Sequence, residues 1–216
     1  LPTDARPVTI ERSRNIASLK TISEFPTTPR ALVFRPTLQT LVLQSSDDQS
    51  WALEDIQFPA DDGVHLAEAI RNRYAIAVSD GSYKEQYGTA AWVIEGEDYV
   101  GWIKGKCTVP GHGTDHDAYR SEAAGLYGIA SMVDMICRHH DITEGRIVVG
   151  CDGDQALKHC TNLKWHLKAD KAHFDLVMAT RKLIEASPIQ WAAQEIEGHQ
   201  DDNPDALLAE LANKLD

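Results

Sequence analysis

Two aspartates stand at the ends of short apolar runs, where a strand would bring each carboxylate to the protein surface. Asp80 follows the run 75–79 and Asp152 follows the run 147–151, and a glycine comes directly after each aspartate. Such runs are too short to span a membrane and are typical of buried strands. If the two strands lie parallel and adjacent, as a crossover helix between them would require, the two carboxylates lie side by side and need a cation.

A third carboxylate is predicted on the helix between these strands. Apolar residues recur at helical spacing from Leu126 to Ile136, and Glu122 lies four residues before Leu126. This spacing puts Glu122 in the first turn, on the stripe that faces the sheet, where an unpaired carboxylate would be costly. We therefore expect a partner for Glu122. Three convergent carboxylates are hard oxygen ligands, which suit magnesium or manganese and not zinc.

From residue 74 onward, the predicted elements follow the order of an α/β protein with a mixed sheet. The first aspartate-ended strand leads into a hairpin, and the second leads into two helices, a last strand and a final helix. The predicted ranges are 89–94 and 99–103 for the hairpin, 155–160 and about 173–185 for the two helices, 189–197 for the last strand and 206–216 for the final helix.

The first third of the chain is punctuated by prolines. Residues 1–73 contain six of the nine prolines, with a possible strand over 40–44 and a helical turn over 66–70. We predict a partly irregular connecting segment over 1–73 and a catalytic domain over 74–216. Because the chain starts without Met and stops at Asp216, we expect it to be a fragment of a longer polypeptide.

The composition of the 216 residues suits a globular intracellular protein. Hydrophobic residues make up 43% of the chain and charged residues 25%, and we find neither a signal peptide nor a membrane-spanning run. The four cysteines form no Cys-x-x-Cys pair, which favours a reducing compartment, either cytoplasm or nucleus. The net charge of −12 argues against a general nucleic-acid-binding protein. It does not exclude an enzyme whose acids bind metal.

The order of these motifs resembles the ribonuclease H family, and most of all the ribonuclease H domain of eukaryotic retroelement reverse transcriptases. The resemblance covers roughly residues 74 to 216. The motifs that carry it are Ser-Asp-Gly-Ser at 79–82, Tyr-Arg-Ser-Glu at 119–122, Cys-Asp-Gly at 151–153, His-Phe-Asp-Leu at 173–176 and Glu-Gly-His-Gln-Asp-Asp at 197–202. It implies an α/β fold with a mixed five-stranded sheet in the order 3-2-1-4-5 and helices on both faces.

The resemblance also implies an activity and further site residues. Members of the family cleave the RNA strand of RNA–DNA hybrids with Mg²⁺ or Mn²⁺, usually as a pair of ions. Asp80, Glu122 and Asp152 match three of the metal ligands, and Asp216 is the predicted fourth, with Asp205 and Glu210 as rivals. The metal ligands count among the catalytic residues. His199 matches a histidine that handles protons or assists product departure.

The resemblance further implies partners, namely an RNA–DNA hybrid and the remainder of a reverse transcriptase polypeptide, with no membrane. Basic residues in the second half are sparse, so we expect this chain alone to bind hybrid weakly. They are Lys158, Lys164, Lys168, Lys171, Arg181 and Lys182. Two alternatives stay open: another nuclease of the same fold, and a non-catalytic domain that keeps the fold for docking or structure.

Several other residues are interpreted as structural and not as part of the site. We expect Asp154 to cap the following helix and Cys151 to be a packing residue. The histidine- and aspartate-containing loop 110–117 is interpreted as a solvated loop. The tryptophans at 92, 102, 165 and 191 are predicted to lie in the core or on a sheet face.

Overall fold

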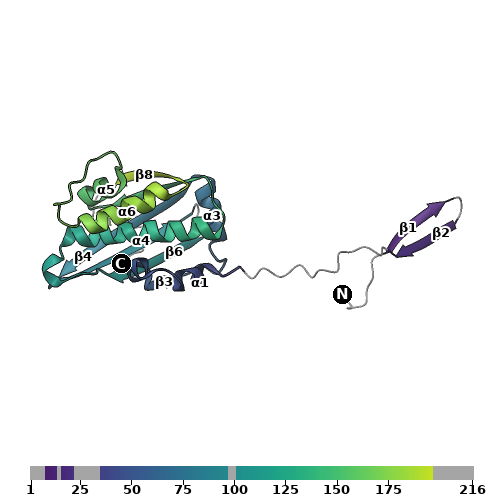
Figure 1. Ribbon diagram of the computed structural model, residues 1–216, viewed down its shortest axis with the longest axis horizontal. Helices are drawn as coiled ribbons and strands as arrows, with labels where there is room; N and C mark the ends of the chain where they lie inside the picture. Colours follow the sequence, from purple (N-terminus) through teal and green to yellow (C-terminus); the bar gives the residue numbers. More distant parts are fainter. Residues whose placement is uncertain (1–7, 14–15, 22–34, 97–100, 197–216) are drawn as a thin grey trace, which may run out of the picture. The chain divides into compact units, whose positions relative to one another are not determined.

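The computed structural model describes residues 8–13, 16–21, 35–96 and 101–196, and the chain divides into two compact units, Leu1–Arg35 and Pro36–Asp216. In the first unit, β1 (Val8–Ser13) and β2 (Ile16–Thr21) form an antiparallel two-stranded sheet. The second unit contains every other described element (Figure 1). The two units are described separately.

The second unit is built on one mixed sheet with strand order β3-β6-β5-β4-β7-β8. Its strands are β3 (Asp55–Gln57), β4 (Ala75–Lys84), β5 (Tyr87–Glu95), β6 (Trp102–Thr108), β7 (Arg146–Cys151) and β8 (Gln190–Glu195). In the predicted domain β5 is antiparallel to both of its neighbours, β4 and β6, and β7 and β8 run parallel to β4. The α/β class and the order 3-2-1-4-5 are confirmed. The expected number of five strands is wrong, because β3 adds a sixth strand beside β6.

Helices pack against this sheet and against one another. They are α1 (Leu38–Leu43), α2 (Asp47–Ser50), η1 (Trp51–Leu53), α3 (Val64–Arg71), η3 (Gly113–Asp115), α4 (Ala118–His139), α5 (Asp154–Thr161) and α6 (Phe174–Ala186). The long helix α4 lies across β4 and β5, and α6 packs on α4 (Figure 1). The helix predicted over residues 206–216 lies outside the described residues.

The segment 36–73 folds with the sheet, so the compact unit begins at Pro36 and not at the boundary expected at residue 74. The strand considered over 40–44 is wrong. Residues 40–43 belong to α1 and Gln44 is its C-cap; the start of α1 is capped by the Thr37 side chain, which accepts a hydrogen bond of 3.2 Å from the Thr40 amide. This local cap favours a helix over a short apolar strand.

Three contacts fasten this segment to α4. The rings of Trp51 and Tyr127 stack with centroids 5.1 Å apart, and the Tyr127 hydroxyl donates to the Asp48 carbonyl at 2.9 Å. Asp62 accepts a hydrogen bond from the Leu38 amide at 2.8 Å and lies 2.7 Å from His139 Nε2. The segment is therefore held against α4 by both stacking and polar contacts.

Trp92 is the largest fully buried side chain and fixes how α4 approaches the sheet. A Cβ atom on Gly128 of α4 would lie 2.5 Å from Trp92 Cδ1, and one on Gly105 of β6 would lie 2.7 Å from Trp92 Cε2. The indole therefore occupies a slot between two glycines, and its predicted core position is confirmed.

Of the other three tryptophans for which a position was predicted, Trp102 and Trp191 lie in strands of the sheet and Trp165 does not. Trp102 is 38% exposed, Trp191 is partly buried, and Trp165 is 49% exposed and outside the sheet, so the predicted position is wrong for Trp165. Trp165 lies in the connection between α5 and α6, and Trp102 begins β6 near an edge of the sheet. In the part of the chain that the structure describes, no helix has the length and apolarity needed to cross a membrane.

Candidate metal centre

The register between β4 and β7 brings Asp80 and Asp152 to neighbouring positions. The two strands pair in parallel, and their last registered pair is Ser79 with Cys151. Each aspartate follows directly after its member of this pair, Asp80 within β4 and Asp152 just past the end of β7, and both are exposed. The chain path after this pair differs from the prediction in one respect: β7 ends at Cys151, but β4 continues to Lys84 because it remains paired with β5.

Glu122 lies in the amino-terminal part of α4 and is 8% exposed. Two glycines let this part of the helix come close to the strand ends. A Cβ atom on Gly81 would lie 2.5 Å from the Ser121 carbonyl carbon, and one on Gly153 would lie 2.7 Å from Glu122 Cγ. Real Cβ atoms do not make such short contacts, so the glycine after each aspartate is required by the close approach of α4.

Two of the three carboxylates predicted to converge lie in one tight cluster, together with a thiol that the prediction did not include. Among the described residues, Glu122, Cys151 and Asp152 offer ligand atoms that all lie within 4.8 Å of one another. The Cys151 thiol donates a hydrogen bond of 3.0 Å to Glu122 Oε2. Cys151 is buried, as expected for a packing residue, but it also contacts the site directly.

The electrostatics of Glu122 reflect this crowding. Burial raises its pKa to about 8, and the negative charges of Asp152 and Asp80 contribute to the rise. The Cys151 hydrogen bond opposes it. Asp80 thus acts on the same site although it is not part of the tight cluster. A group of carboxylates held together at this cost fits a divalent cation, which would neutralise the shared charge.

The raised pKa of Glu122 predicts a pH dependence of stability without metal. A carboxyl group whose folded-state pKa exceeds its ordinary value contributes stability below pH 4.5, and this contribution is lost as the pH rises toward 8. We expect Glu122→Gln to be increasingly more stable than the unmodified chain between pH 5 and pH 8, by about 5 °C in Tm at the upper end. The measurement is thermal unfolding in EDTA across this range.

Glu195→Gln is the matched control, because Glu195 is an exposed residue that pairs with Lys158 at 2.9 Å. A plot of its Tm against pH should run parallel to the plot for the unmodified chain. Parallel pH profiles for Glu122→Gln and the unmodified chain would contradict the burial of a crowded carboxylate at this position.

An ion-pair network beside the site was missed by the sequence analysis. The Arg120 guanidinium donates to both carboxylate oxygens of Asp175, at 3.2 and 3.1 Å, and lowers the pKa of Asp175. His173 Nε2 lies 2.9 Å from Asp117 Oδ2, and the Asp117 side chain also caps α4. These contacts fix the starts of α4 and α6 to each other. In the sequence, the residue that could have indicated this network is Arg120, two residues before Glu122.

Two neighbouring interpretations are corrected. His116 in the loop 110–117 is 8% exposed and its Nδ1 accepts a hydrogen bond from the Gly88 amide at 3.1 Å, so this part of the loop is packed and not solvated. Asp154 does not cap α5. The helix is preceded by Gly153, without a side-chain cap, and Asp154 in its first turn pairs with Lys158 at 2.6 Å.

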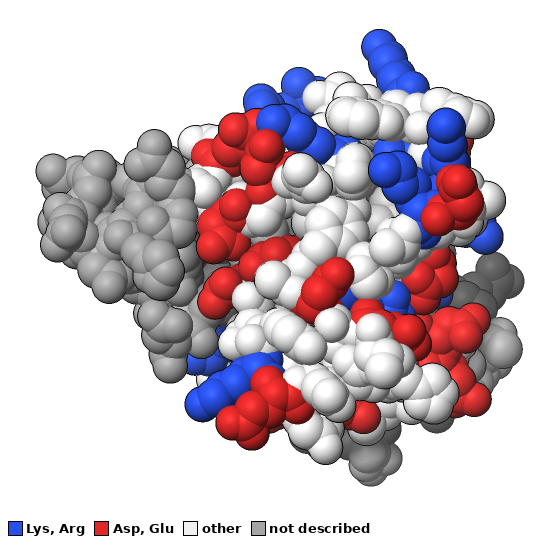
Figure 2. All heavy atoms as spheres, turned by 90° about the vertical axis from the view of Figure 1, so that its left-hand side faces the viewer, with Lys and Arg blue, Asp and Glu red and all other residues white. Residues whose placement is uncertain are grey.

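The basic residues in the second half divide into exposed and structural ones. Lys164, Lys168 and Lys171 are exposed on the connection between α5 and α6. Arg181 is buried, and its guanidinium donates to the carbonyls of His159 and Trp165, at 2.6 and 2.7 Å. Figure 2 shows many of the Lys and Arg side chains of one face in its upper part and a further group at the lower left, with Asp and Glu side chains in patches among uncharged residues.

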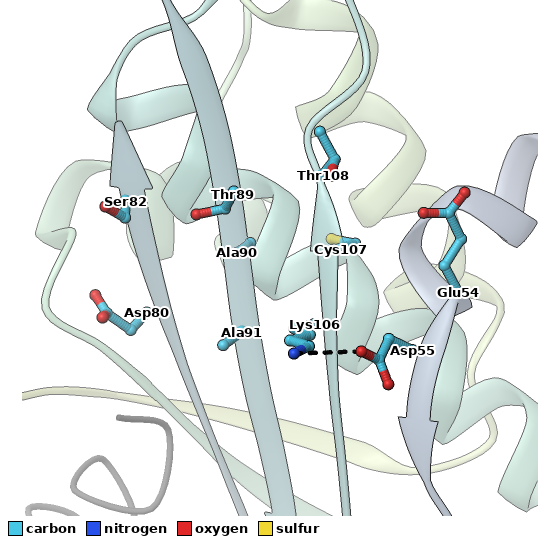
Figure 3. Close-up of a pocket in the computed structure, with 10 residues that line it drawn as sticks. All are labelled: Glu54, Asp55, Asp80, Ser82, Thr89, Ala90, Ala91, Lys106, Cys107 and Thr108. Atoms are coloured by element: carbon cyan, nitrogen blue, oxygen red, sulfur yellow. Dashed lines mark ion pairs between the residues drawn. The ribbon is translucent and has the colours of Figure 1, made fainter. Parts of the chain in front are cut away.

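A groove of about 540 Å³ begins at Asp80 (Figure 3). It is lined by residues of β3, β4, β5 and β6, together with Glu54, which precedes β3. The remaining predicted site residues, His199 and Asp216, lie outside the described residues, as do the rivals Asp205 and Glu210.

No protein-family model and no curated protein matches the chain. Similar solved structures include the N-terminal RNase H domain of Rv2228c from Mycobacterium tuberculosis, with 14% identity over 66% of this chain and 96% of that chain, and a TM-score of 0.41. RNase H1 from Halobacterium salinarum NRC-1 has 17% identity over 65% of this chain and 98% of that chain, with a TM-score of 0.40. LC11-RNase H1 in complex with an RNA/DNA hybrid has 11% identity over 65% of this chain and 97% of that chain, with a TM-score of 0.43. These values are too low to establish a family or an activity, and the fold class rests on the strand order and pairing.

Proposed function

We propose that this chain is a divalent-metal-dependent endoribonuclease that cleaves the RNA strand of RNA–DNA hybrids. The observation that carries the proposal is the crowding of Glu122 and Asp152, with Asp80 on the adjacent strand, at a position where burial and like charge raise the pKa of Glu122. Carboxylates gathered in this way are characteristic of sites that bind Mg²⁺ or Mn²⁺. The ribonuclease H-like strand order and the sequence motifs support the choice of reaction.

The proposed roles follow from position. Asp80, Glu122 and Asp152 would hold the ions, with Asp216 as the proposed fourth ligand. When bound, a pair of such ions supplies activation of the attacking water and charge stabilisation at the leaving oxygen. Gly81 and Gly153 allow the start of α4, which carries Glu122, to come close to the backbone beside Asp80 and Asp152. Proton handling is assigned to His199. The products would be a 3′-hydroxyl and a 5′-phosphate, with no covalent bond to the protein.

The proposed substrate is recognised through its backbone and not its base sequence. Hybrids differ from duplex DNA by 2′-hydroxyls across the minor groove. The exposed lysines on the connection between α5 and α6 are suited to phosphate contacts, and the exposed indole of Trp165 on the same connection is suited to stacking. We also propose that the chain is part of a reverse transcriptase polypeptide and that it acts inside the cell.

The test is cleavage of a labelled RNA–DNA hybrid, with duplex RNA and duplex DNA of the same sequence as controls. We expect RNA-strand cleavage with Mg²⁺ or Mn²⁺, none with EDTA, and a rise in Tm when the ion is added. Cleavage confined to duplex DNA or duplex RNA would indicate another nuclease of this fold. If neither ion raised the Tm and no duplex were cut, the chain would be a non-catalytic domain.

A further inference from the structure

The candidate metal centre contains a sulfur atom beside its carboxylates. A ligand atom from each of Glu122, Cys151 and Asp152 lies within 4.8 Å of the other two. The sequence predicted a centre of oxygen ligands alone, and on that ground it favoured Mg²⁺ or Mn²⁺ over zinc. The structure changes this ligand set, because a cysteine thiolate is a soft ligand that selects zinc and similar ions.

The end of β7 explains how two consecutive side chains reach one site. Along a continuing strand, Cys151 and Asp152 would point to opposite faces of the sheet. β7 ends at Cys151, and the backbone then turns, with the Asp154 amide donating to the Asp152 carbonyl at 2.9 Å. The turn lets the Asp152 carboxylate come within 4.8 Å of Cys151 Sγ. Among the described residues, no other cysteine lies in a group of three such ligands.

The spacing of these ligand atoms suits a tetrahedral ion. Zinc bonds of about 2.3 Å to sulfur and about 2.0 Å to carboxylate oxygen place the ligand atoms about 3.5 Å from one another. Cys151 Sγ and Glu122 Oε2 are 3.0 Å apart, and the set as a whole spans no more than 4.8 Å. Small side-chain movements are therefore enough to enclose an ion. Asp152 is exposed, so the third ligand is open to solvent.

We infer that this centre also binds thiophilic divalent ions, of which Zn²⁺ is the type, through Cys151, Glu122 and Asp152 together. The S–H bond of Cys151 breaks, its electron pair forms the bond to the ion, and the proton passes to solvent. With Mg²⁺ the thiol keeps its proton, since a hard ion takes oxygen ligands. A thiophilic ion occupies carboxylates that Mg²⁺ requires and so inhibits cleavage. This last consequence rests on the proposed function, whereas the binding does not.

Binding is tested with Co²⁺, a spectroscopic substitute for Zn²⁺, on the full chain with its thiols kept reduced by a phosphine. A thiolate bound to Co²⁺ gives a sulfur-to-metal charge-transfer band in the near ultraviolet, which carboxylate and imidazole ligands do not give. Cys151→Ser replaces the sulfur with oxygen. Cys107→Ser is the matched control, because Cys107 is also a free, buried strand thiol and lies outside this group.

We expect the band in the unmodified chain and in Cys107→Ser, its removal by Zn²⁺, and no band in Cys151→Ser. Zn²⁺ affinity should fall at least about 10-fold in Cys151→Ser, since loss of a partner that only supports a ligand already costs that much. Mg²⁺ affinity, followed by the rise in Tm, should fall by less than Zn²⁺ affinity. Inhibition of cleavage by Zn²⁺ should weaken in Cys151→Ser by the same factor as Zn²⁺ binding.

Asp152→Asn repeats the test at an exposed position, should Cys151→Ser not fold. The band should then need at least about 10-fold more Co²⁺ to develop. The inference is overturned if the unmodified chain shows no band, if the band survives in Cys151→Ser or is lost in Cys107→Ser, or if Asp152→Asn binds Co²⁺ as tightly as the unmodified chain. Failure of the proposed function is seen separately, as lack of hybrid cleavage with Mg²⁺ in a chain that still shows the band.

Discussion

Replacing Asp152 with asparagine is expected to lower cleavage of an RNA–DNA hybrid about 1000-fold while leaving the fold intact. Asp152 is exposed, and its ligand atom lies within 4.8 Å of those of Glu122 and Cys151. The amide keeps the shape of the side chain but removes the negative charge that binds a divalent ion. The measurement is single-turnover cleavage at saturating enzyme, with Mg²⁺ titrated for each protein.

Asp154→Asn is the control for this substitution. Asp154 is an acid two residues away, exposed and paired with Lys158. Its loss should change the cleavage rate less than about 3-fold, because exposed ion pairs contribute little. If both variants lost cleavage activity equally, or if Asp152→Asn kept full activity, Asp152 would not be a metal ligand.

Gly81→Ala is expected to destabilise the fold by about 3 kcal/mol and to impair cleavage at the same time. The added methyl group would overlap the backbone of α4, at the Ser121 carbonyl carbon and the Glu122 amide. Backbone atoms cannot rotate away as a side chain does, so α4 must shift relative to β4. Urea unfolding gives the change in stability, and the Mg²⁺ dependence of Tm reports the displaced ligands.

Gly150→Ala provides a comparison on the neighbouring strand. A Cβ atom there would lie 3.4 Å from Ile196 Cγ2, which is close to ordinary contact. We expect a change within about 1 kcal/mol, since a strand alanine also loses less chain entropy than glycine. If Gly81→Ala were as stable as Gly150→Ala, the close approach of α4 to Asp80 would be wrong.

Much of the sheet could be predicted from the sequence because its signals are local. The apolar runs before Asp80 and Asp152 and the helical spacing after Glu122 each depend on a few consecutive residues. The added strand β3 could not be predicted in this way. It is three residues long, and it is defined by pairing with Lys104 and Lys106, some 50 positions away. Long-range pairing of this kind leaves no periodic pattern in so short a segment.

The acids of the candidate site could be predicted from the sequence, but the contacts that position them could not. The positions of Glu122 and Asp152 followed from their elements, and the structure brings these two together. The glycines beside the aspartates suggested strand ends, whereas Gly81 lies within β4 and permits contact with α4. The burial of His116 was missed because its partner, the Gly88 amide, is a backbone group 28 residues away. Sequence patterns do not reveal such partners.

The slot that holds Trp92 has a consequence for how related sequences can vary. Gly105 and Gly128 come from β6 and α4, and each is limited to hydrogen by the same indole ring. A larger residue at either position is therefore compatible with this packing only if position 92 becomes smaller. We expect these three positions to covary across homologues, as a group separate from the acids. A sequence that keeps the acids but changes one member of this group alone would have to pack α4 differently on the sheet.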